Sequence, residues 1–131
     1  TFLCDLVTAS NVETIKGSDW DCSNTANKCT DWDGIFCTSG VITKIDLAND
    51  GVSGTLPSSI GSLTELSFLF LKYNSFSGTL PSTVGSLNLL KQLQVHQNSF
   101  HSSLPDMFSS MSQLTKLYLD GNSFTGNLPV S

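Results

Sequence analysis

The sequence contains no arginine, and only 13% of its 131 residues are charged. Its formal net charge is −5, so the chain has no basic stripe that could neutralise a phosphate backbone. Nucleic acids and anionic membrane surfaces are therefore poor candidates for partners. Long apolar runs are also missing, and Thr1 does not begin a charged and then apolar leader segment. The sequence consequently predicts no direct membrane insertion by this segment.

Cysteine is scarce and confined to one part of the chain. All four cysteines lie between Cys4 and Cys37, in a segment that is also rich in aspartate. An even number of cysteines in one short segment favours disulfide bonds over a metal site, and four cysteines allow three pairings. We therefore expect an extracellular protein that passes through the secretory pathway and holds no metal or cofactor.

What the chain does have is a repeat of 24 residues, with units that begin at Ile42, Leu66, Leu90 and Leu114. Each unit carries three apolar residues in an LxxLxL spacing, then an asparagine or aspartate, and later a Leu-Pro pair. Recurrence at a fixed spacing of this size is the signature of a solenoid. The asparagine column is Asp50, Asn74, Asn98 and Asn122, and the four prolines directly follow Leu56, Leu80, Leu104 and Leu128.

Each column has a physical reason. The alternating LxL segment is typical of a strand whose leucines point inward, so successive units should stack into a parallel sheet that forms a concave wall. An asparagine in the turn after the strand can bond backbone groups that would otherwise be buried unpaired, and a column of them predicts a hydrogen-bonded ladder. Proline presets φ, which predicts short helical turns at 58–60 and 82–84 on the convex side.

The residues before the repeats differ from them in composition and pattern. The first repeat exposes an apolar end that must be covered, so we expect an N-terminal cap here. The segment contains Trp20, and then the run Cys29-Thr30-Asp31-Trp32-Asp33-Gly34-Ile35-Phe36-Cys37. Its apolar residues with the spacing of a short amphipathic helix are Phe2, Leu3, Leu6 and Val7.

With this cap, and with repeats that follow an N-x-x-S/T-G-x-I/L-P pattern as in 74–81, the chain resembles the plant-type leucine-rich-repeat family. The resemblance implies an α/β repeat fold: a right-handed leucine-rich-repeat solenoid with a parallel concave β-sheet, short helical or 3-10 convex turns, and a disulfide-bonded N-terminal cap. It also implies the pairs Cys4–Cys22 and Cys29–Cys37. We expect residues 1–41 to form the cap and 42–131 the repeats, of which the fourth is incomplete.

Recognition rather than catalysis is the activity that this resemblance implies. The family includes ectodomains of receptor-like kinases, secreted polygalacturonase-inhibiting proteins and surface proteins of some protists. We therefore expect a module of a receptor or surface protein that binds a protein or peptide ligand, with carbohydrate as a further option. A secreted inhibitor of a cell-wall-degrading enzyme and an adhesive protist surface repeat stay open as alternatives. The last unit, without a closing cap, predicts either a continuing chain or end-to-end self-association.

Candidate binding residues are the outward positions among the inward leucines, because they have no role in the core. Exposed aromatic clusters tend to mark contact surfaces. The alternative is that these aromatics only cover the sheet or contact another copy. We expect no catalytic residue, because the serines belong to repeat columns and none is accompanied by a histidine and an acid. The concave-face residues predicted to bind the ligand are Phe68, Phe70, Lys72, Tyr73, Gln94, His96 and Tyr118.

One of these residues supports two interpretations. His96 stands in the same predicted column as Lys72 and Asp120. A histidine titrates near physiological pH, so His96 could make binding depend on pH. A merely solvated histidine is the simpler interpretation.

Overall fold

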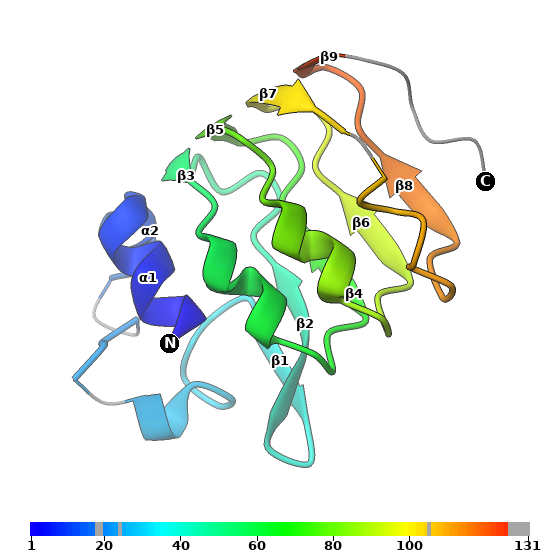
Figure 1. Ribbon diagram of the computed structural model, residues 1–131. Coiled ribbons are helices and arrows are strands. Elements are labelled where there is room, and N and C mark those ends of the chain that lie inside the picture. The colour runs from blue at the N-terminus through cyan, green and yellow to red at the C-terminus, as the bar shows by residue number, and fades with distance from the viewer. Residues whose placement is uncertain (18–19, 24, 105, 126–131) are drawn as a thin grey trace.

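The computed structural model describes residues 1–17, 20–23, 25–104 and 106–125, and it shows the repeats as units stacked side by side (Figure 1). One sheet runs through all of the units. It contains, in order, β1 (Ile35–Thr38), β2 (Val41–Asp46), β4 (Phe68–Phe70), β6 (Gln92–Gln94) and β8 (Lys116–Tyr118). β1 is antiparallel to β2, whereas the other neighbouring strands are parallel. The predicted parallel sheet is therefore confirmed, and the β1–β2 hairpin extends it toward the cap.

The strand register follows the 24-residue period of the sequence. Ile45, Leu69, Leu93 and Leu117 occupy equivalent positions in successive parallel strands. The first three are fully buried, and Leu117 packs partly buried against the same core. The middle apolar residues of the LxxLxL pattern thus form the spine of the hydrophobic core.

A second sheet, which the sequence patterns do not predict, follows the first within each unit. Its strands are only three to five residues long and consist largely of serine and threonine. In β5 a single apolar side chain, Phe76, points into the core. Segments this short and polar lack the alternation by which a strand is recognised. The strands are β3 (Ser53–Thr55), β5 (Ser75–Gly78), β7 (Ser99–Ser103) and β9 (Ser123–Thr125), in that order.

Two 3-10 helices confirm the predicted helical turns. η3 (Ser58–Ser62) follows Pro57, and η4 (Ser82–Ser86) follows Pro81. The two helices pack so closely that a Cβ added to Gly61 would lie only 2.7 Å from the Cβ of Thr83. Within the described ranges, no helix has the length and apolar character that a membrane crossing requires.

Phenylalanine rings stack along the interior of the solenoid. The ring centroids of Phe76 and Phe100 are 5.9 Å apart, and those of Phe100 and Phe124 are 6.2 Å apart. Phe76 and Phe100 are fully buried. Because each ring rests on the ring of the next unit, the stability of one unit depends on its neighbours.

The predicted asparagine ladder is also present. Nδ2 of Asn98 donates to the backbone oxygens of Leu71 and Val95, at 2.9 and 3.1 Å. Its Oδ1 accepts the backbone N–H of Phe76 at 3.0 Å. The asparagines of the flanking units make equivalent contacts. Each asparagine therefore ties its own turn to the preceding unit and pairs backbone groups that lie away from water.

The cap contains the predicted helix and both predicted disulfides. Trp20 and Trp32 stack at its centre with ring centroids 5.0 Å apart, and both are buried. The helices are α1 (Phe2–Ala9), α2 (Val12–Lys16) and the 3-10 helix η2 (Thr25–Asn27). The disulfides are Cys4–Cys22 and Cys29–Cys37.

A lysine ties the cap to the first repeat. The Lys16 side chain is only 9% exposed, and its Nζ lies 2.7 Å from Oδ2 of Asp33 and 2.8 Å from Oδ2 of Asp50. Burial lowers the pKa of Lys16, but hydrogen bonds and charges from the two carboxylates outweigh it, and the pKa is raised above its ordinary value. Asp50 occupies the asparagine column of the first repeat. Its carboxylate binds the ammonium group of Lys16, whereas the asparagines of the later units donate hydrogen bonds to the backbone of the preceding unit.

Replacing Lys16 with methionine is expected to lower the free energy of unfolding by about 1–2 kcal/mol at neutral pH, because Asp50 loses its cation. A pKa raised on folding means that this stabilisation is present below the unfolded pKa of 10.5 and is lost as the pH rises through the folded pKa. Thermal unfolding should therefore separate the two proteins at pH 7, and the difference should shrink as the pH rises past 10.5. Lys28→Met removes the same charge from the cap and serves as control. An equal loss of unfolding free energy in Lys28→Met would contradict a specific role for the contacts of Lys16 with the two aspartates.

Candidate binding surface

Two aromatic and two amide side chains stand on the outer face of the sheet. Phe68 and Phe70 flank the buried leucine of β4, and their ring centroids are 5.9 Å apart. Gln92 and Gln94 flank the buried leucine of β6, and Nε2 of Gln94 donates to Oε1 of Gln92 at 3.1 Å. All four side chains are half-buried. Strand alternation alone thus directs them away from the core.

Three further predicted residues lie beyond the strands. β4 ends at Phe70 and β6 at Gln94, so Lys72, Tyr73 and His96 lie in the irregular segments that follow. This differs from the strand positions expected from the sequence. Tyr73 adopts a left-handed φ of 56°, which ends the alternation of the strand. The Tyr73 N–H still donates to the backbone oxygen of His96 at 3.1 Å, so the successive turns remain stacked.

His96 joins the aromatic residues of three units. Its ring packs edge-on against Tyr73, with centroids 5.2 Å apart, and against Tyr118 on β8, with centroids 5.4 Å apart. Tyr73 and Tyr118 are 53% and 42% exposed. Nδ1 of His96 is buried without a hydrogen-bond partner in the part of the chain that the structure describes. The histidine therefore holds two exposed tyrosines in one cluster.

Lys44 organises a second cluster at the cap end of the sheet. Its Nζ lies 5.0 Å from the ring centroid of Phe36 and 5.3 Å from that of Phe70. Phe36 is 48% exposed and pairs with Lys44 across the β1–β2 hairpin. Neither residue is among the seven binding residues predicted from the sequence. The alternation of Ile35, Phe36 and Cys37 just before the first repeat is typical of a strand. This pattern could have indicated that Phe36 adds an outward-facing ring beside the repeats.

The predicted binding residues therefore form two clusters on one surface. Phe68 and Phe70 belong to the cluster around Lys44, and Tyr73 and Tyr118 to the cluster around His96. Gln94 stands in register between Phe70 and Tyr118. Lys72 is half-buried in the turn between Phe70 and Tyr73. We use the term concave wall for the surface formed by Phe36, Lys44, Asp46, Phe68, Phe70, Lys72, Tyr73, Gln92, Gln94, His96, Lys116, Tyr118 and Asp120.

The chemistry that the concave wall offers is contact chemistry. Exposed rings can bury apolar groups, and the amides and lysines can hydrogen-bond to a partner. Among the described residues, no three histidine, cysteine, aspartate or glutamate side chains are grouped so that they could hold a metal ion. The arrangement suits recognition of another molecule.

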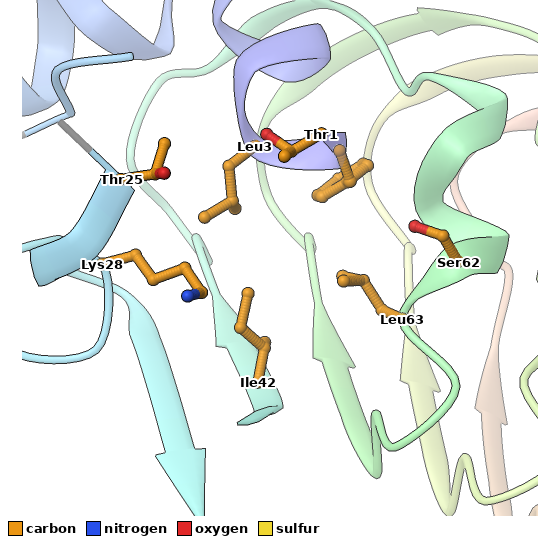
Figure 2. Close-up of a pocket in the computed structure, with 8 residues that line it drawn as sticks. Thr1, Leu3, Thr25, Lys28, Ile42, Ser62 and Leu63 are labelled. Atoms are coloured by element: carbon orange, nitrogen blue, oxygen red, sulfur yellow. The ribbon is translucent and has the colours of Figure 1, made fainter. Parts of the chain in front are cut away.

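A hollow of about 240 Å³ lies elsewhere, where the cap meets the first repeat. Figure 2 shows Leu3 from the cap and Ile42 and Leu63 from the first repeat around it, with the Lys28 side chain on one side. None of the predicted binding residues lines this hollow. It is a gap between packed elements, separate from the concave wall.

Comparison with known proteins points to one class. A family model described as leucine rich repeat matches residues 64–124. Receptors and receptor kinases of Arabidopsis thaliana, Pisum sativum and Oryza sativa are 36–43% identical over 49–62 residues. These matches cover 34–47% of this chain but only 5–6% of the relatives, so the chain corresponds to a small part of each relative.

Solved structures give longer matches. PEPR1, in a structure of PEPR1–AtPEP1, is 36% identical with a TM-score of 0.88, and the match covers 98% of this chain and 18% of that one. The leucine-rich-repeat ectodomain of the receptor kinase SOBIR1 from Arabidopsis thaliana is 29% identical with a TM-score of 0.75, covering 98% of this chain and 71% of that one. The plant peptide hormone receptor RGFR1, in complex with RGF2, is 28% identical with a TM-score of 0.66, covering 75% and 19%.

The repeat register, the asparagine ladder and the two cap disulfides agree with these matches. The chain has a leucine-rich-repeat fold with a disulfide-bonded N-terminal cap, and it is similar to parts of the ectodomains of plant receptor kinases.

Proposed function

We propose that this chain is an extracellular recognition module of a receptor or other surface protein, and that it binds a protein or peptide partner through the concave wall. Residues 1–41 serve as the cap in this proposal, and the units from residue 42 onward present the binding surface. The observation that carries the proposal is the cluster of Tyr73, His96 and Tyr118, which exposes two tyrosine rings across three units without a role in the core.

Energetic considerations support this use of the wall. Tyrosine and phenylalanine rings provide large contact areas at low cost in side-chain entropy, and such residues dominate binding energies at protein interfaces. The half-buried amides of Gln92 and Gln94 add hydrogen-bonding groups between the rings, which suit the backbone of an extended peptide.

The relatives and the cap support the remaining parts of the proposal. Among the similar structures, RGFR1 is a plant peptide hormone receptor, and the SOBIR1 structure is the ectodomain of a receptor kinase. Disulfides such as those of the cap persist in oxidising compartments, which fits secretion and an extracellular location.

Selection of peptide binders, followed by footprinting, tests the proposal. The protein would be immobilised to select peptides from a displayed random heptapeptide library, and the selected peptides would be resynthesised with acetylated and amidated ends. Hydroxyl-radical footprinting would then compare the free and the bound protein. We expect protection of Tyr73 and Tyr118, whereas Leu89, which is 42% exposed outside the wall, keeps its reactivity. Peptides that protect Leu89 and leave both tyrosines reactive would contradict the proposal.

A further inference from the structure

The ammonium group of Lys44 lies between two aromatic rings. Phe36 stands on one side at 5.0 Å and Phe70 on the other at 5.3 Å, measured from Nζ to the ring centroids. Cation–π contacts hold the ammonium group in place and remove part of its hydration, but they use none of its three N–H donors in ordinary hydrogen bonds. Lys44 therefore presents a positioned cation with free donors on the surface of the wall.

No carboxylate in the described ranges lies within 4.0 Å of this ammonium group, whereas Nζ of Lys16 contacts two. Asp46, the next outward residue on β2, already accepts the backbone N–H of Ala48 at 3.1 Å. The half-buried rings of Phe70 and Phe68 continue from the ammonium group along the wall, with centroids 5.9 Å apart. A charged group and an apolar platform thus lie side by side without an internal partner for the charge.

We infer that Lys44, Phe68 and Phe70 form a subsite for an acidic residue of an extended peptide whose neighbouring same-face residue is apolar. The inference rests on the proposed function and specifies the partner's chemistry at one end of the wall. The ligand's carboxylate accepts hydrogen bonds from Nζ of Lys44, and its apolar side chain covers the rings of Phe68 and Phe70.

The dimensions of an extended chain fit this arrangement. Side chains two residues apart in a strand lie on the same face, about 6.6–6.8 Å apart. Nζ of Lys44 lies 5.3 Å from the centroid of Phe70, and the centroids of Phe70 and Phe68 are 5.9 Å apart. The subsite therefore selects an acid and an apolar residue separated by one residue. The charge specifies the ligand more than it tightens binding, because exposed ion pairs are individually weak.

The test uses the peptides selected on the intact protein, each prepared as a matched pair that differs by aspartate against asparagine. The wild-type protein is expected to bind the aspartate form about three to five times more tightly, and added salt should reduce this preference. Lys44→Gln should abolish the preference. Lys91→Gln is the matched control, because the exposed Lys91 lies directly before β6 and outside the concave wall. It should leave the preference intact.

Three results would overturn the subsite. They are selected peptides without enrichment of an acid two residues from an apolar residue, a preference for aspartate that survives Lys44→Gln, and a preference that Lys91→Gln removes equally. Each of these can occur while Tyr73 and Tyr118 are still protected on binding, so the subsite can fail while the proposed function stands. Peptides that bind elsewhere on the protein contradict both.

Discussion

Replacing Asn98 with leucine is expected to lower the free energy of unfolding by about 2–4 kcal/mol, although the side chains are similar in size. Asn98 is only 8% exposed, and its Oδ1 accepts the N–H of Phe76 at 3.0 Å. Leucine would leave that N–H buried without this acceptor and would remove the three donations from Nδ2 to backbone oxygens. Chemical denaturation monitored by tryptophan fluorescence and by circular dichroism measures the change.

Two companion variants show whether hydrogen bonding is the cause. Asn98→Asp keeps an acceptor for the Phe76 N–H. However, it places a carboxylate against the backbone oxygens of Leu71 and Val95, which accept hydrogen bonds from Nδ2 in the unchanged protein. It should be at least as unstable as Asn98→Leu at pH 7. Asn88 is exposed, so Asn88→Leu should change the free energy of unfolding by less than about 0.5 kcal/mol. A loss at Asn98 no larger than at Asn88 would contradict the ladder.

The period of the sequence predicted those parts of the molecule that depend on one unit and its copies. Leu69 and Leu93 had to face inward because every unit repeats the same strand, and Asn98 had to bond backbone because its column recurs in the turn. The outward directions of Phe68 and Phe70 followed from the same alternation. In each case the local pattern and the stacking of units require the same arrangement.

Features that depend on contacts between different kinds of segment could not be predicted in this way. The carboxylates that bind Lys16 come from the cap and from the first repeat, and no repeated pattern relates them. The pairing of Phe36 with Lys44 arises from a hairpin that occurs once, at the junction with the cap. The second sheet escaped prediction because its strands carry too few apolar residues to show a period.

The candidate surface was predicted in position but not in internal organisation. The sequence placed His96 in a column with a lysine and an aspartate, whereas its ring packs between Tyr73 and Tyr118. That packing depends on side-chain rotamers in two neighbouring units and on the left-handed backbone at Tyr73, for which φ is 56°. A column assignment states which side chains are neighbours in a solenoid, but it does not state which of them make contact.

Loss of binding in the double variant Phe70→Ala/Tyr73→Ala tests the central claim most directly. Each ring belongs to a different cluster of the concave wall, so the variant removes contacts from both. Isothermal titration with a selected peptide is expected to show at least about a hundredfold weaker binding, which corresponds to about 2.7 kcal/mol. Because Tyr73 is 53% exposed and Phe70 half-buried, the thermal midpoint should remain near that of the unchanged protein.

Leu89→Ala is the control for this measurement, since it removes an apolar side chain of similar exposure outside the wall. Our account predicts that Leu89→Ala binds the peptide as the unchanged protein does, while the double variant folds but does not bind. Undiminished binding by the folded double variant would show that the partner contacts another surface.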